Sequence, residues 1–111
     1  MKQIVAYIRS EQLPAVKRAL ADAEIHQFIA ISALGTAPKT ERHMVRGVER
    51  EITLTRRVQM TLVVPDALLD ACTAAVTLGC EESGGWGIIF VTEVLDVINV
   101  TTGERGPEAL H

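Results

Sequence analysis

Strand-like and helix-like segments follow one another along this chain of 111 residues in the order strand, helix, strand, strand, helix, strand. The strand-like runs are rich in β-branched and aromatic residues, and the helix-like runs repeat apolar residues every three or four positions. We expect strands over Lys2–Arg9, Ile25–Leu34, Val58–Val64 and Ile88–Val100, and helices over Leu13–Ala23 and Asp66–Gly79. This order predicts an α+β, ferredoxin-like βαββαβ fold with both helices on one face of an antiparallel sheet.

Single residues mark the expected ends of these elements. Pro14 fits the first turn of the first helix, where its missing N–H has no consequence. Asp66 follows Pro65 and is placed to cap the second helix, and Gly79 is placed to end it. Gly35 is expected to end the second strand.

Apolar residues fall on both sides of the expected sheet, among them Ile31, Met60 and Leu62. Two helices cover only one side, so the other side needs a partner. We therefore expect the chain to form an oligomer.

Length and composition fit one domain over residues 1–111, with 48% hydrophobic residues. No apolar run approaches the roughly 20 residues that span a bilayer. Lys2 and Arg9 interrupt the N-terminus, which argues against a signal peptide. Cys72 and Cys80 have no metal-ligand spacing, so we expect a cytoplasmic protein with reduced thiols.

Residues 36–55 keep neither the strand nor the helix period, and we expect them to form a long exposed loop. Six of the eleven basic residues lie between Lys39 and Arg57, a window that holds only three acidic residues. A basic loop on an acidic body indicates an interaction segment. A polar tail is expected over about residues 102–111.

Several motifs together resemble the PII signalling proteins, which are small trimeric sensors of carbon, nitrogen and energy status. The similarity covers essentially the whole chain. It rests on the opening MKQIVAYIR, the helix LPAVKRAL, Gly35 before a long loop, VRGVER within that loop, a Pro-Asp helix start, GGWGIIFV and the ending TTGERGPEAL.

The resemblance implies an adenine nucleotide in a cleft between neighbouring subunits. Glycines let backbone N–H groups approach phosphate oxygens closely, although they also serve any tight turn. The residues that it assigns to the cleft are Gly35 at the loop root, Leu62 and Val63 on the third strand, Gly84, Gly85 and Gly87 in the glycine-rich turn, and Ile88 and Phe90 on the strand after it.

Several positions depart from the family pattern. Ile88 replaces a lysine, and Asn99 and Thr101 replace two arginines that hold the outer phosphates. Each charge-assisted hydrogen bond contributes about 1.5–3 kcal/mol. The departures therefore favour AMP or ADP over ATP, with cyclic AMP as a further candidate.

The loop departs from the family pattern as well. Arg50 and Val48 stand where family members carry a modified tyrosine or serine, and Thr36–Thr40 lacks the glutamine that helps to hold Mg–ATP–2-oxoglutarate. Arg46 matches the family's loop arginine, and we expect it to contact phosphate. Lys39, His43 and Arg50 are weaker candidates for the same role.

The resemblance predicts a regulatory protein rather than an enzyme. The loop would control a protein partner, either a membrane transporter or a carbon-metabolism enzyme. Divergent members tied to bicarbonate transport and carboxysomes suggest a role in inorganic-carbon metabolism, with bicarbonate as a second effector and recruitment to a transporter. The alternatives are a nitrogen-regulatory PII that senses ATP and 2-oxoglutarate, an RNA-binding ferredoxin-like module, and a small trimeric enzyme.

The remaining residues give little support to other chemistry. No catalytic constellation can be assembled, and His26 and His43 lack partners for a metal. Cys72 is expected in the core, Cys80 near an exposed helix end, and Trp86 in an exposed turn at a subunit contact. The strand VQMTLVV lacks the aromatic residues on which RNA bases stack.

Overall fold

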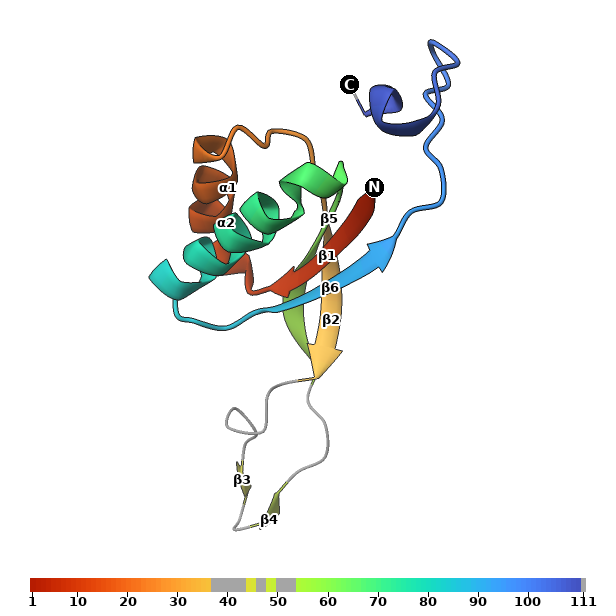
Figure 1. The fold of residues 1–111 in the computed structure, drawn as a ribbon. Helices are drawn as coiled ribbons and strands as arrows, with labels where there is room; N and C mark the ends of the chain where they lie inside the picture. The colour runs from red at the N-terminus through yellow and green to blue at the C-terminus, as the bar shows by residue number, and fades with distance from the viewer. Residues whose placement is uncertain (37–43, 46–47, 50–53, 111) are drawn as a thin grey trace.

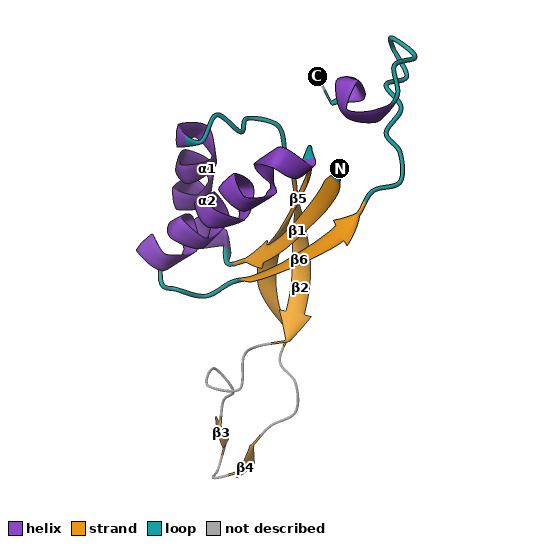
Figure 2. Cartoon of the chain, viewed as in Figure 1, coloured by secondary structure: helices purple, strands orange, loops and turns teal. Residues whose placement is uncertain are grey.

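The computed structural model describes residues 1–36, 44–45, 48–49 and 54–110. Two helices lie on one side of a four-stranded sheet, as Figures 1 and 2 show. The strands are β1 (Lys2–Ile8), β2 (Ile29–Thr36), β5 (Leu54–Val64) and β6 (Ile88–Glu93), and the helices are α1 (Leu13–Asp22) and α2 (Leu69–Glu82). The strand order is β2-β5-β1-β6, with every pair antiparallel. The predicted ferredoxin-like architecture is confirmed.

Smaller elements complete the described chain. Three of them are short 3-10 helices. One precedes α1, namely η1 (Ser10–Gln12), and one precedes α2, namely η3 (Asp66–Leu68). The third lies in the C-terminal tail, namely η4 (Gly106–Ala109). The strands β3 (Met44–Val45) and β4 (Val48–Glu49) pair with each other inside the segment that was expected to be a loop throughout. No helix of the described residues is long and apolar enough to cross a membrane.

The core fills the space between the helices and the sheet. Alternate residues of β1 and β5 point toward the helices, because successive side chains of a strand face opposite sides. They meet the buried stripes of both helices, and the largest fully buried side chains are Ile4, Ile8, Gln12, Val16, Leu20, Met60, Cys72 and Val76.

Gly79 lies inside α2 and does not end it, contrary to the prediction. A Cβ built at Gly79 would lie 2.5 Å from the Cα of Val16 on α1. The two helices therefore approach each other closely at a position that only glycine fits. The helix continues to Glu82.

Asp66 is not the cap of α2 either. It begins η3, and its carboxylate accepts a 2.8 Å hydrogen bond from the N-terminal ammonium of Met1. The N-terminal ammonium holds the pKa of Asp66 below its ordinary value. The start of the second helical segment is thus tied to the start of β1.

Strand bounds differ from the prediction at several places. Ile25 is buried as a core residue after the turn at Glu24, where φ is 61°, and β2 begins only at Ile29 and runs through Gly35. The strand β5 begins four residues before Val58, at Leu54. The strand β6 ends at Glu93, so Asn99 and Thr101 lie in the tail and not in a strand.

The sheet face opposite the helices exposes apolar side chains. Ile31 is 50% exposed there, opposite Gln59 of β5, and Ile29 and Phe90 are also exposed. Met60 and Leu62 face the helices and are fully buried or nearly so, so that, together with Ile31 on the uncovered side, they supply apolar groups to both sides of the sheet. The expectation that this face needs cover therefore rests on Ile29, Ile31 and Phe90.

Candidate functional site

The glycine-rich turn joins the end of α2 to β6. Gly84 and Gly85 have φ values of 112° and 78°, a region that side-chain-bearing residues rarely adopt. Nothing lies within 4 Å of a Cβ built at either glycine, so the outer surface of the turn is open. The backbone N–H of Gly85 donates a 2.7 Å hydrogen bond to the carbonyl of Cys80, which fixes the turn on the helix end.

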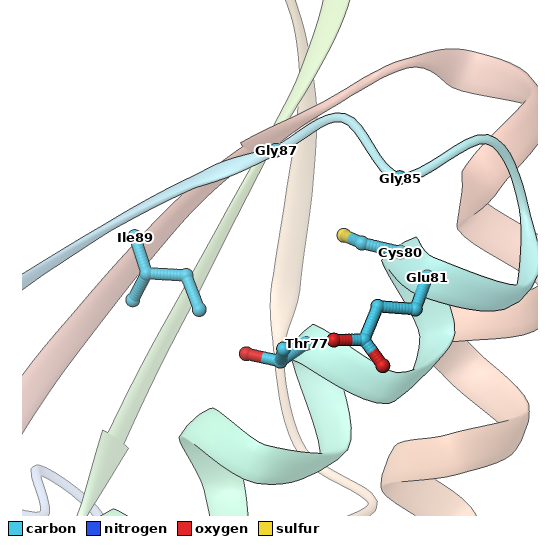
Figure 3. Close-up of a pocket in the computed structure, with 6 residues that line it drawn as sticks. All are labelled: Thr77, Cys80, Glu81, Gly85, Gly87 and Ile89. Carbon is cyan, nitrogen blue, oxygen red and sulfur yellow. The ribbon is translucent and has the colours of Figure 1, made fainter.

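A small cavity lies between α2, this turn and the start of β6 (Figure 3). It measures about 140 Å³ and is lined by Thr77, Cys80, Glu81, Gly85, Gly87 and Ile89. Cavities that enclose a small-molecule ligand usually measure about 300–1,000 Å³. This cavity is therefore too small to enclose such a ligand by itself.

Cys80 is buried beneath the turn, contrary to the expectation of exposure. Its sulfur would lie 2.9 Å from a Cβ at Gly87, so Gly87 is required for close packing. Burial raises the pKa of the Cys80 thiol, and it raises the pKa of Cys72 to about 11. Both thiols stay protonated at neutral pH.

The loop root lies at the same end of the sheet, on the outer strand β2. Gly35 pairs with Thr55 of β5, whose hydroxyl donates a 3.3 Å hydrogen bond to the Gly35 carbonyl. A Cβ at Gly35 would lie 3.4 Å from Cγ of Arg57. A groove of about 400 Å³ beside the root is lined by Ser32, Ala33, Leu34 and Arg56.

Two arginines and Trp86 connect the turn with the loop root. The guanidinium of Arg57 lies 4.5 Å from the centre of the Trp86 ring, and that of Arg9 lies 5.8 Å from it. Such contacts contribute about 0.5–2 kcal/mol. Trp86 is partly buried under this contact, whereas Gly84, Gly85 and Gly87 around it are exposed, as predicted for the turn.

Sequence reasoning counted Arg9 and Arg57 among the bases but gave neither a role. The signal that could have identified them is their position, because Arg9 follows β1 and Trp86 precedes β6 at one end of the sheet. Tyr7 pairs with Ile88 and Ile8 with Val58, so the neighbouring residues Arg9, Trp86 and Arg57 come together. This cluster required strand register, which periodicity does not supply.

Val63 lies at the opposite end of β5. It lines a groove of about 390 Å³, within the usual size for small ligands. The other lining residues are Glu24, Ile25, His26, Gln27, Val64, Pro65, Leu68, Pro107 and Leu110. The strand rises about 3.3 Å per residue, so Val63 and Thr55 are roughly 26 Å apart along β5. Within one chain, Val63 and Gly35 cannot contact the same nucleotide.

The other predicted residues are placed as follows. The side chain of Leu62 is 2% exposed in the core and offers no surface to a ligand, whereas Ile88 and Phe90 are half-exposed on the free face of β6. Arg46, Lys39, His43 and Arg50 lie outside the residues that the structure describes.

The tail forms its own turn beyond the sheet (Figure 1). The side-chain oxygen of Asn99 accepts hydrogen bonds from the N–H groups of Thr101 and Thr102, at 2.9 and 3.2 Å. Arg105 pairs with Asp96 and lowers its pKa. The side-chain oxygen of Asn99 is thus engaged in holding the turn.

The described residues hold no group of three His, Cys, Asp or Glu side chains that could bind a metal ion. Arg9, Arg56 and Arg57 place positive charge at the end of the sheet that holds the glycine-rich turn and the loop root, and positive charge suits contact with an anion.

Comparisons with known proteins give one consistent result. Residues 1–104 match the family model described as nitrogen regulatory protein P-II. The chain is 34% identical to nitrogen regulatory protein GlnK1 of Methanosarcina mazei, over 99% of this chain and 97% of that protein. It is 34% identical to nitrogen regulatory protein P-II 1 of Methanothermobacter thermautotrophicus, with the same coverage. It is 31% identical to nitrogen regulatory protein P-II 1 of Escherichia coli K12, over 99% and 100% of the two chains.

Proposed function

The chain belongs to the P-II family of regulatory signalling proteins, and from this premise we propose that it senses an adenine nucleotide bound between subunits. Family membership agrees with the prediction that the chain is not an enzyme. The observation that carries the proposal is that the two regions to which we assign the nucleotide lie far apart within one chain. The Val63 groove and the loop root lie at opposite ends of β5, so two copies are needed to complete one site.

The Val63 groove suits the base and ribose. Its walls combine apolar groups, such as Val63 and Leu68, with the polar side chains of His26 and Gln27. Sites of this kind bury the flat part of a ligand and fix it with a few polar groups. The phosphates would then reach the glycine-rich turn and loop root of the neighbouring copy, as a trimer of the family type allows.

The phosphate end favours AMP or ADP over ATP. Ile88 is apolar and 48% exposed beside the turn, where a lysine would be available to an outer phosphate. Asn99 is neutral, and its side-chain oxygen accepts two backbone hydrogen bonds in the tail. A γ-phosphate would therefore find fewer cations here than a site with three basic residues offers.

The relatives favour nitrogen metabolism as the regulated process. Their names describe nitrogen regulators, which supports the nitrogen-regulatory alternative over a role in inorganic-carbon metabolism. The comparisons give no support to bicarbonate as an effector. We propose a transporter or an enzyme as the protein partner, contacted through the basic loop.

Calorimetric titration of the purified protein with AMP, ADP, ATP and cyclic AMP tests this proposal. Each nucleotide is titrated alone, with Mg²⁺ and 2-oxoglutarate, and with bicarbonate. We expect AMP or ADP to bind more tightly than ATP. Tighter binding of ATP than of both would overturn the preference, and the absence of any adenylate binding would overturn the proposed function.

A further inference from the structure

Gln12 carries the only amide among the largest fully buried side chains of the described chain. Burying an amide is unfavourable unless its polar atoms find hydrogen-bond partners. Here both find one: Oε1 accepts a 2.8 Å hydrogen bond from the Arg9 N–H, and Nε2 donates a 2.7 Å hydrogen bond to the Trp86 carbonyl. The side chain of Gln12 therefore joins the residue after β1 to the backbone of the glycine-rich turn.

The bond from Gln12 fixes the direction of the peptide unit between Trp86 and Gly87. In a trans peptide the C=O and the N–H point in opposite directions, and the unit is planar. Because the Trp86 carbonyl points at the buried amide, the N–H of Gly87 points away from it. Gly87 itself is exposed. Gln12 thus holds the Gly87 N–H in a direction away from the buried amide.

The contacts around the turn single out this N–H group. The N–H groups of Ser83 and Gly85 both donate to the carbonyl of Cys80, at 3.1 and 2.7 Å, so they are engaged in forming the turn. Gly87 packs closely on Cys80, since a Cβ built at Gly87 would lie 2.9 Å from its sulfur (Figure 3). The packing fixes the position of Gly87, and Gln12 fixes the direction of its N–H.

We propose that Gln12 is a positioning residue that presents the Gly87 N–H to a phosphate oxygen of the nucleotide, an inference that rests on the proposed function. A donor that is oriented before binding contributes more affinity, because the ligand does not have to order it. Without the Gln12 amide, the Trp86 carbonyl loses its partner and turns toward solvent. The same rotation turns the Gly87 N–H away from the ligand.

Isotope labelling can isolate this one peptide unit in the full chain. The chain has a single tryptophan, so tryptophan labelled with ¹³C at the carbonyl and glycine labelled with ¹⁵N give one coupled amide signal, that of Trp86–Gly87. In the parent protein we expect saturating ADP to move the Gly87 amide proton downfield, as a hydrogen bond to phosphate does. A Gly87 signal that does not move while calorimetry shows ADP binding would overturn the proposal.

Gln12→Met removes the anchor and keeps a side chain of similar length. In the free protein, the labelled Trp86 carbonyl signal should shift, because its hydrogen bond is lost. We expect ADP affinity to fall by at least about tenfold, the effect of losing one hydrogen bond to a charged group. The movement of the Gly87 amide proton on ADP addition should shrink as well. Calorimetry measures the affinity, and the labelled signal measures the contact.

Ile4→Ala separates positioning from general loss of stability. Ile4 is fully buried on β1, and its strand partners Leu62 and Val91 lie away from the turn. This variant should be less stable in urea but should keep the ADP affinity and the Gly87 signal of the parent.

Two results would overturn the role of Gln12. One is ADP binding by Gln12→Met within about twofold of the parent. The other is a loss of affinity in Ile4→Ala as large as that in Gln12→Met. If Gln12→Met does not fold, the Gly87 signal of the parent decides alone. If the parent binds no ADP, the proposed function fails as well, whereas parent-like binding by Gln12→Met refutes the positioning role only.

Discussion

Glycine serves two different purposes at single positions of this chain. Gly84 and Gly85 supply a backbone conformation with positive φ, and the space around them is open. Gly79 supplies the absence of a side chain, because the backbone of α1 passes where its Cβ would be. A sequence pattern cannot distinguish these two roles, because in both cases it shows only a glycine near the end of a helix. For this reason Gly79 was mistaken for a helix stop.

Gly79→Ala tests the close approach of the two helices. At an open helix position this change would stabilise the protein by about 1 kcal/mol. Here the added Cβ meets the backbone of Val16, so we expect the free energy of unfolding in urea to fall by about 1–3 kcal/mol or more. Glu81→Ala, an exposed control on the same helix, should change it by less than about 0.5 kcal/mol. A Gly79→Ala protein as stable as the parent would contradict this packing.

Ile88→Lys tests the account of nucleotide preference. The site is half-exposed at the start of β6, so a lysine side chain can be accommodated beside the turn. One charge-assisted hydrogen bond of about 1.5–3 kcal/mol should raise ATP affinity by about 10–100-fold, and AMP affinity far less. Ala74→Lys adds the same charge on an exposed face of α2 and controls for net charge. Calorimetry that shows equal gains for AMP and ATP would contradict the account.

At the scale of elements, the type and order of the four main strands and both helices were predictable, because the strand segments are rich in β-branched and aromatic residues and the helical segments repeat apolar residues every three or four positions. Their ends were not, because tertiary contacts decide them. Ile25 has strand-like chemistry but is buried as a core residue before β2 begins, and the apolar residues after Glu93 leave the sheet. Asp66 has a capping side chain, yet the N-terminal ammonium is its partner.

The contact between Met1 and Asp66 gives stability a defined pH dependence. Folding lowers the pKa of Asp66 from 3.8, so the contact stabilises the protein above that pH and is lost as pH falls through the folded value. Asp66→Asn should be less stable than the parent at pH 7, and the difference should shrink toward pH 2. Urea unfolding across this range measures it. Acetylation of the N-terminus removes the other partner, so it should lower the stability of the parent at pH 7 as Asp66→Asn does. It should not lower the stability of the Asp66→Asn protein any further. Losses of stability that simply add would contradict the pairing.

At the scale of the whole molecule, a single chain has an uncovered apolar sheet face and only part of the proposed nucleotide site. The face of the sheet away from the helices exposes Ile29, Ile31 and Phe90, and the proposed nucleotide contacts lie at opposite ends of β5. The uncovered face could be anticipated, because the strands carry apolar residues for both sides of the sheet, with Met60 and Leu62 on the helix side and Ile31 on the other. The arginine–tryptophan cluster could not be anticipated, because it depends on the register of three strands. Association of several copies would cover the face and complete the site together.

Ile31→Glu places a charge on the uncovered face, where association would bury it. Burying an unpaired carboxylate is strongly unfavourable. Light scattering should therefore give about three times 12.1 kDa for the parent and about 12.1 kDa for the variant. The exposed position of Ile31 leaves the fold of the single chain intact, which circular dichroism checks. A variant that keeps the parent's mass would show that this face is not the contact.

The most direct test of a site shared between subunits is calorimetric titration of ADP into the assembled parent and into the dissociated Ile31→Glu protein. The account predicts one ADP per subunit in the parent and affinity at least about 100-fold weaker, a loss of about 2.7 kcal/mol, in the single chain. A dissociated Ile31→Glu chain that binds ADP as tightly as the parent would place the whole site within one subunit and contradict the account.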